Sequence, residues 1–244
     1  MKKVFTKAFL VAVALGTSVL AFAQDAAPVV EESFHQALKT KFIEGSANFM
    51  SMVAIALILG LAFVIERIIY LNLADTNADK LLKGIEAALD KGDVEAAKAI
   101  ARDTRGPIAS IAYQGLLRIN QGIDVVEKSI VSYGGVQGGL LEKNLSWITL
   151  FIAMAPSLGF LGTVVGMIMA FDKIEQVGDI SPTVVAGGMK VALITTVGGL
   201  VVALLLQVFY NYLLSKLEAI LNKMEDASIT LLDLVIKYSV KFQK

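Results

Sequence analysis

Cysteine is absent from the 244-residue sequence, and histidine occurs once, as His35. Without cysteine the chain cannot form disulfide bonds, thiolate metal sites or a cysteine nucleophile, and one imidazole is too few for a zinc site or a hydrolytic triad. Neither sign of charge is in excess, because 22 lysine and arginine residues balance 22 aspartate and glutamate residues. We therefore expect no metal, no cofactor and no nucleic acid as a partner.

Charged residues are also scarce. They make up 18% of the chain, against about a quarter in an average soluble domain, whereas apolar residues make up 56%. The mean hydropathy is +0.68. This composition is typical of a membrane protein, in which spans of about 20 apolar residues consume much of the chain. Too little remains for a large soluble enzyme, and we predict no enzymatic activity.

The amino end has the pattern of a secretory signal peptide. A basic start and an apolar run end in Ala21-Phe22-Ala23, the small-x-small pattern of a cleavage site. This predicts a signal peptide over 1–23, with an uncleaved anchor as the alternative, and places 24–46 in the periplasm. Apolar residues recur there at every fourth position, at Phe34, Leu38 and Phe42. We expect a short amphipathic helix on the membrane surface, in contact with lipid.

Three long apolar stretches each suffice to cross a bilayer. They predict transmembrane helices over 47–73, 144–172 and 182–214, separated by a cytoplasmic helical domain over 74–143 and a periplasmic loop over 173–181, and followed by a cytoplasmic helical tail over 215–244. Acidic residues dominate near the loop, and lysine and arginine cluster on the opposite side, so the positive-inside rule places the carboxyl end in the cytoplasm. The signal-like amino end gives the same orientation independently. We expect a multi-pass protein of the bacterial inner membrane with a periplasmic amino end.

The segment between the first two spans has helical spacing of its apolar residues. Gly92-Asp93 is typical of a turn between two helices, and Gly106-Pro107 of a second break. No strand pattern of useful length occurs. The predicted fold class is an all-α membrane protein with three transmembrane helices and a helical cytoplasmic domain.

Small residues recur at steps of three and four along the second and third spans. They are Ala155, Gly159, Gly162, Gly166 and Ala170 on the second span, and Ala192, Gly199 and Ala203 on the third. Such a face lets another helix backbone approach closely, which lipid-embedded helices need because van der Waals fit drives their association. The spacing leaves open whether these faces pack on each other, on sister subunits or on another protein.

Thr163 and Thr196 lie near the middle of the second and third spans, with Thr195 beside the latter. One interpretation is that each hydroxyl bonds back to a carbonyl one turn earlier in its own helix. The other is that the hydroxyls line a hydrated path or face a carboxyl group of another chain. No Asp or Glu occupies the middle of a span, so a proton-conducting role requires a titrating group from another subunit.

Four further positions are candidates for an interface or a gate. Glu66 and Arg67 close the first span at its cytoplasmic end, where they mark an interface boundary or pair with neighbours. Lys190 enters the third span near its outer end, where it either extends to the membrane surface or faces a pore. Pro156 removes one backbone hydrogen bond from the second span and is expected to kink it.

Two segments carry a family resemblance. The run APSLGFLGTVVGM over 155–167 and the run ALITTVGGL over 192–200, followed by Tyr210-Asn211, resemble the two signature spans of the MotA/TolQ/ExbB proton-channel family. The cytoplasmic stretch 92–117 is similar too. The resemblance covers about residues 45–240, and the run around Pro156 is far more specific than a generic pattern of small residues.

The resemblance implies a homopentameric ring of three-span subunits around a dimer of single-span ExbD- or TolR-like subunits. In that family an Asp of the partner carries the proton, and proton flow drives work at the outer membrane or cell wall. Thr163 and Thr196 match the family's pore threonines, and Thr195 is a further candidate for the proton path. An ExbB-like chain would energise TonB-dependent outer-membrane transport through a TonB-like protein.

Val191 departs from the family, because ExbB and TolQ proteins commonly carry a Glu at this position, here adjacent to Lys190. Any gating role of that Glu is therefore not transferred. The signal-like amino end and the length of the cytoplasmic insert favour an ExbB-type protein over a flagellar stator. The alternatives are a TolQ-like subunit for cell-envelope integrity, another motility-type motor, and a helical membrane scaffold that conducts nothing.

Overall fold

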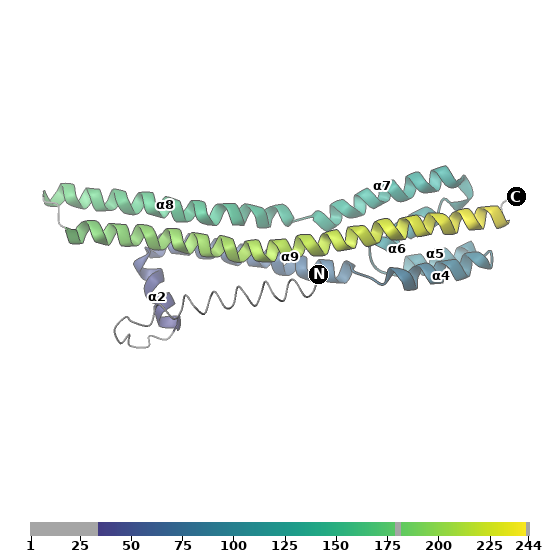
Figure 1. Cartoon of the computed structure of the whole chain (residues 1–244), viewed down its shortest axis with the longest axis horizontal. Coiled ribbons are helices and arrows are strands. Elements are labelled where there is room, and N and C mark those ends of the chain that lie inside the picture. The colour runs from purple at the N-terminus through teal and green to yellow at the C-terminus, as the bar shows by residue number, and fades with distance from the viewer. Residues whose placement is uncertain (1–33, 179–181, 243–244) are drawn as a thin grey trace, which may run out of the picture. The chain divides into compact units, whose positions relative to one another are not determined.

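A computed structural model of the chain describes residues 34–178 and 182–242 (Figure 1). The chain divides into two units, Met1–Ile43 and Glu44–Lys244. In the first unit, the described residues belong to helix α2 (Phe34–Glu44), which lies within the predicted periplasmic segment. The predicted signal peptide lies outside the described residues.

The second unit is helical throughout its described residues and contains no strand there. Its elements are α3 (Ala47–Ala74), α4 (Ala78–Asp90), α5 (Val94–Asp103), α6 (Pro107–Leu116), the short 3-10 helix η1 (Ile119–Gln121), α7 (Ile123–Glu142), α8 (Leu145–Val177) and α9 (Pro182–Phe242). The predicted all-α class is confirmed.

Helices α3, α8 and α9 contain the apolar stretches that are long enough to cross a membrane. Their outward faces carry large apolar side chains, among them Ile58 (65% exposed), Phe160 (65%) and Leu204 (67%). So many exposed apolar side chains require lipid or protein neighbours rather than water. The chain is a multi-pass membrane protein.

Local chemistry sets the helix boundaries between α4 and α6. The Asp93 carboxylate accepts a hydrogen bond from the main-chain nitrogen of Ala96 at 2.9 Å, which caps α5 after the predicted turn. Gly106 has a φ of 112°, which glycine adopts readily, and Pro107 occupies the first position of α6. Both predicted breaks are confirmed.

The loop predicted over 173–181 begins later than expected, because residues 173–177 continue α8. The helix ends at Gly178, whose φ is 73° and whose main-chain nitrogen donates to the Ile174 carbonyl at 2.9 Å. The first charged residues after an apolar span mark the water boundary, where a helix can continue with its backbone bonds intact. Charge therefore placed the loop boundary too early.

Helix α9 connects the membrane-spanning helices to the shorter helices that lie between α3 and α8 in the sequence. It is one helix of 61 residues, and at 1.5 Å per residue it is about 90 Å long. Its first part packs along α8 and α3, and its later part contacts α4, α6 and α7 (Figure 1). Buried side chains recur along it at steps of three and four, including Leu213, Leu217, Ile220, Met224 and Ala227. A continuous core therefore joins both regions of this unit.

Candidate functional site

The small faces of α8 and α9 pack on each other within one chain. A Cβ atom at Gly159 would lie 2.7 Å from the main-chain oxygen of Thr195, and one at Gly162 would lie 2.8 Å from the Thr195 Cβ. The two backbones thus approach too closely for any side chain at these glycines. The predicted packing residues are all buried: Ala155, Gly159, Gly162, Gly166, Ala170, Ala192, Gly199 and Ala203.

This close approach brings together the two threonines predicted from the sequence. The Thr163 hydroxyl on α8 hydrogen-bonds the Thr196 hydroxyl on α9. Thr163 Oγ1 also lies 2.9 Å from the main-chain oxygen of Ala192, and Thr196 Oγ1 lies 3.2 Å from the same oxygen. The Ala192 carbonyl is therefore the centre of a polar cluster, which we call the threonine cluster: Thr163, Thr195, Thr196 and the Ala192 carbonyl.

The three threonines differ in their hydrogen bonds and exposure. Thr195 is fully buried and donates to the Ala192 carbonyl at 2.8 Å. Thr163 and Thr196 are half-buried. Thr196 bonds back within its own helix, whereas the shorter bond of Thr163 crosses to α9, since its contact with the Gly159 carbonyl is longer at 3.4 Å. The back-bonding interpretation thus accounts for Thr195 and Thr196, whereas Thr163 bonds to the neighbouring helix of its own chain, and the hydrated-path interpretation stays a prediction.

The threonine cluster receives no carboxylate from its own helices. Residues 145–171 and 182–214 contain neither Asp nor Glu. Among the described residues no group of three histidine or acidic side chains could hold a metal ion. The cluster offers hydroxyl and carbonyl groups as hydrogen-bonding partners, but none of them titrates near neutral pH.

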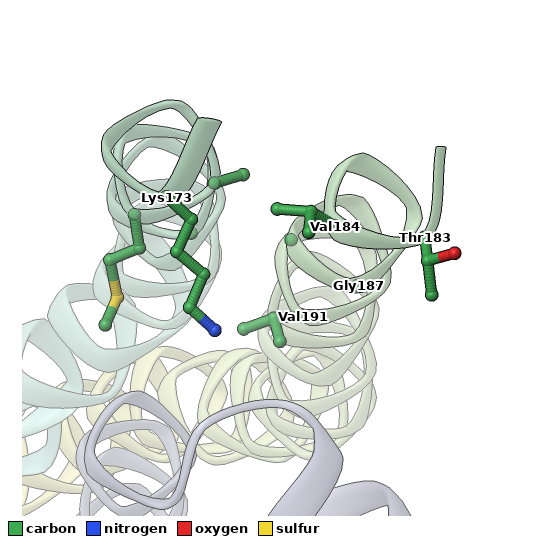
Figure 2. A pocket seen from close by; sticks show the side chains of 9 residues that line it. Lys173, Thr183, Val184, Gly187 and Val191 are labelled. Atoms are coloured by element: carbon green, nitrogen blue, oxygen red, sulfur yellow. The ribbon is translucent and has the colours of Figure 1, made fainter. Parts of the chain in front are cut away.

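A cavity of about 460 Å³ lies between α8 and α9, toward the ends that the loop connects. Lys173 and Val191 are among its lining residues, and Figure 2 shows the Lys173 side chain extending from α8 across the space toward α9. Gly166, one turn beyond Thr163, also lines the cavity and lies against Ala192. The cavity therefore adjoins the threonine cluster.

Lys190 and Pro156 take no part in the threonine cluster. The Lys190 ammonium lies 2.6 Å from the Glu44 carboxylate, its side chain is 54% exposed, and it does not line the cavity. Its partner is thus the half-buried Glu44 carboxylate, and the choice between the membrane surface and a pore stays a prediction. Helix α8 continues through Pro156, and the predicted kink stays a prediction.

Glu66 and Arg67 form a separate polar network at the opposite end of the membrane-spanning helices. The Arg67 side chain is 3% exposed, and two of its nitrogens bind the Glu66 carboxylate at 2.7 and 2.6 Å. A third nitrogen lies 3.4 Å from the Leu141 carbonyl, and the Asn144 amide lies 3.4 Å from Glu66. Asn144 precedes α8, and Thr163 lies about 27 Å further along that helix. The structure therefore does not bring this pair to the threonines.

Sequence reasoning missed a charge cluster between α9 and the residues that follow α3. The Asp75 carboxylate accepts hydrogen bonds from the Lys216 ammonium at 2.7 Å and the Lys223 ammonium at 2.6 Å. The bond from Lys216, followed by that from Lys223, lowers the pKa of Asp75, and the same carboxylate raises the pKa of Lys216. The spacing of two lysines two turns apart on one helix face was the only sequence signal.

Comparison with known proteins shows which family and which relatives this chain is similar to. The model of the MotA/TolQ/ExbB proton channel family matches residues 104–226. A protein described as a putative biopolymer transport protein ExbB homolog from Methanothermobacter thermautotrophicus is 28% identical over 69% of this chain and 60% of its own length. Biopolymer transport protein exbB1 from Vibrio cholerae is 37% identical over 33% of this chain and 39% of its own length. Biopolymer transport protein ExbB from Aquifex aeolicus is 35% identical over 32% of this chain and 53% of its own length. The chain thus matches 39 to 60% of the length of these relatives.

Proposed function

Because the chain belongs to the MotA/TolQ/ExbB proton channel family, we propose that it is the channel-forming subunit of an ExbB-type motor in the bacterial inner membrane. Its amino end would lie in the periplasm and its carboxyl end in the cytoplasm. The proton motive force would drive the motor, which would energise TonB-dependent outer-membrane transport. The similarity to relatives described as ExbB proteins supports the ExbB-type role over the TolQ-type alternative.

The threonine cluster is the observation that carries this proposal. Thr163 and Thr196 hydrogen-bond each other in an otherwise apolar helix pair and are half-buried, and in the proposed assembly their hydroxyls would meet a group from outside the chain. A charged carboxylate inside a membrane is costly unless polar groups surround it. The cluster supplies such groups but no acid, and the acid would come from the partner.

In the proposed assembly, five copies of the chain surround a dimer of single-span subunits that each carry an intramembrane Asp. Five repeats of the threonine cluster would offer that Asp a ring of nearly equivalent hydrogen-bonding positions. A proton arriving from the periplasm neutralises the carboxylate and lets it pass the apolar wall, and release to the cytoplasm restores its charge. Thr195, which is fully buried, would hold the Ala192 carbonyl in place rather than meet the proton.

Proton flux into lipid vesicles tests the proposal. The chain is purified and reconstituted with the single-span, Asp-bearing protein that we expect beside its gene, and flux is followed with an internal pH dye. We expect partner-dependent flux that falls at least about tenfold in the Thr163→Val, Thr196→Val double variant, since a hydrogen bond worth 1.4 kcal/mol corresponds to a factor of ten.

The matched control is Thr149→Val, because Thr149 is an exposed α8 threonine that bonds the Ser146 carbonyl. Co-purification of the partner with each variant verifies assembly. Normal flux in the assembled double variant, flux from the chain alone, or flux that survives replacement of the partner's Asp by Asn would each refute the role. The last outcome would favour a scaffold that conducts nothing through this path.

A further inference from the structure

Lys173 is the one charged residue among the described residues that line the cavity at the loop ends of α8 and α9. The other lining residues are small, apolar or uncharged, such as Gly166, Ala170, Val184 and Val191. Side chains on a helix lean toward its amino end, and that direction carries the Lys173 ammonium back along α8, into the cavity (Figure 2).

The described residues give this ammonium no counter-ion. Lys173 makes no hydrogen bond or ion pair within 34–178 and 182–242, and no acidic residue lines the cavity. Asp172 and Glu175 are close in sequence, but positions one and two residues away on a helix face other directions. Lys190, by contrast, is paired with Glu44 at 2.6 Å. The cavity thus has the charge and the volume for an anionic group.

The cavity ends next to the threonine cluster, although no residue of the cluster lines it. Gly166 and Val191 line the cavity, and Ala192, the next residue, accepts the threonine hydrogen bonds. Lys173 lies ten residues beyond Thr163, about 15 Å along the helix, and its long side chain spans part of that distance. An anion held by Lys173 would therefore lie on the loop side of the two hydroxyls, at a separate position along the same pair of helices.

We propose that this cavity receives the ionised carboxylate of the single-span partner and that Lys173 is its counter-ion. This inference rests on the proposed function and adds a second position for the carboxylate. Its charged form pairs with the ammonium at the cavity, in addition to the positions that the threonine cluster offers it. Lys173 is exposed at the end of the apolar stretch of α8, so the pairing is an attraction at the edge of the span rather than between buried charges. Lys173 positions the carboxylate and exchanges no proton with it.

Thiol cross-linking tests the placement directly, because the chain has no cysteine of its own. Lys173→Cys is combined with a cysteine at the partner's Asp position, and the two proteins are treated in vesicles with a bifunctional thiol reagent whose spacer is about as long as a lysine side chain, since a direct disulfide needs Cβ atoms about 4 Å apart. We expect a cross-linked product that is at least about tenfold more abundant than with Asp172→Cys, an exposed neighbour that does not line the cavity. Equal or absent cross-linking at the two positions would overturn the inference.

Charge variants test the role of the ammonium. In vesicles of phosphatidylcholine alone, we expect flux to fall about tenfold in Lys173→Met, to fall further in Lys173→Glu, and to be largely retained in Lys173→Arg. Lys128→Met, a change at an exposed lysine on α7, is the control and should conduct as the unmodified chain does. Rescue by arginine separates a charge role from a packing role, because arginine keeps the charge but changes the shape.

The outcomes distinguish this inference from the proposed function. If flux depends on the partner's Asp and on the threonines while Lys173→Met conducts normally, the proposed function stands and the inference fails. If Lys173→Met reduces flux only when the vesicles contain anionic lipid, the occupant is a lipid phosphate and the inference fails. If the unmodified assembly conducts nothing, the proposed function fails, and cross-linking alone then decides whether the carboxylate lies at Lys173.

Discussion

Arg67 and Leu141 are 74 positions apart in the sequence, yet a guanidinium nitrogen of Arg67 donates to the main-chain oxygen of Leu141 at 3.4 Å. The same guanidinium binds Glu66 through two nitrogens and lies over the Tyr70 ring, with its central carbon 4.3 Å from the ring centroid. The contact joins α3 to the end of α7, just before α8 begins. A single buried side chain thus links α3 to the junction between α7 and α8.

Replacing Arg67 should loosen this junction. We expect Arg67→Met to lower the free energy of unfolding by about 1–3 kcal/mol, because the Leu141 carbonyl and the Glu66 carboxylate both lose a donor. Arg67→Lys should recover only part of the loss, since lysine cannot bind a carboxylate through two nitrogens in a fixed fork. Thermal unfolding in detergent, followed by circular dichroism, measures the change.

The control for Arg67 is Arg102→Met. Arg102 also pairs with a neighbouring carboxylate, that of Asp103, but the two side chains are 66% and 72% exposed. Exposed pairs contribute little, so the change should stay within about 0.5 kcal/mol. Equal effects at positions 67 and 102 would show that burial of Arg67 contributes nothing to the junction.

Gly159→Ala should separate α8 from α9. The added methyl group would lie 2.7 Å from the Thr195 carbonyl oxygen and 3.1 Å from the Thr196 Cα, and neither backbone atom can move without shifting α9. We expect a loss of about 1–3 kcal/mol in the free energy of unfolding. A lower melting temperature of the purified protein would report it.

Gly139→Ala, on α7, should raise the stability of the protein instead of lowering it. A Cβ atom at Gly139 meets nothing within 4 Å, so alanine adds helix propensity without a clash. Stability should rise by about 0.5–1 kcal/mol. If both glycine variants were stabilised, close contact between α8 and α9 would not describe the protein in solution.

Asp75→Asn should remove a pH-dependent part of the stability. Hydrogen bonds from Lys216 and Lys223 lower the pKa of Asp75 in the folded protein below its ordinary value of 3.8. A lowered folded pKa stabilises the protein above the unfolded value, and this contribution is lost as the pH falls through the folded value. The melting-temperature difference between the unmodified protein and the variant should therefore be largest near neutral pH and shrink below about pH 4.

Asp226→Asn is the matched control for Asp75. Asp226 is an exposed carboxylate further along α9 that forms no ion pair with the described residues, and its replacement should leave the melting temperature nearly unchanged. Melting curves at several pH values compare the two variants. A difference for Asp75→Asn that grew on acidification would reverse the expected sign and contradict the assignment of the ion pair.

Thr195→Val should lower the stability of the protein but leave proton flux nearly unchanged. Thr195 is fully buried between the helices and donates to the Ala192 carbonyl, so valine keeps its shape and removes one hydrogen bond. We expect a loss of about 1 kcal/mol in stability. Flux with the partner should stay within about twofold of the unmodified chain, and a loss as large as that of the Thr163, Thr196 double variant would place Thr195 on the path.

The sequence predicted the all-helical class, the three apolar spans and the breaks at Gly92-Asp93 and Gly106-Pro107. These features depend on local composition and spacing, which can be read along the chain. It also identified Thr163 and Thr196, because polar residues inside apolar spans are few. It placed the start of the last loop too early, because the charge at Lys173 marks the edge of an apolar stretch and not the end of a helix.

The sequence by itself determined which segments are apolar enough to enter a membrane and which positions on them are small or hydroxylated. Only the tertiary structure decided that the two small faces pack on each other, and that Lys173 extends into the cavity. It also paired Asp75 with Lys216 across 141 residues. The physical reason is that helix formation follows from neighbours in the chain, whereas contacts between faces depend on how helices pack in space.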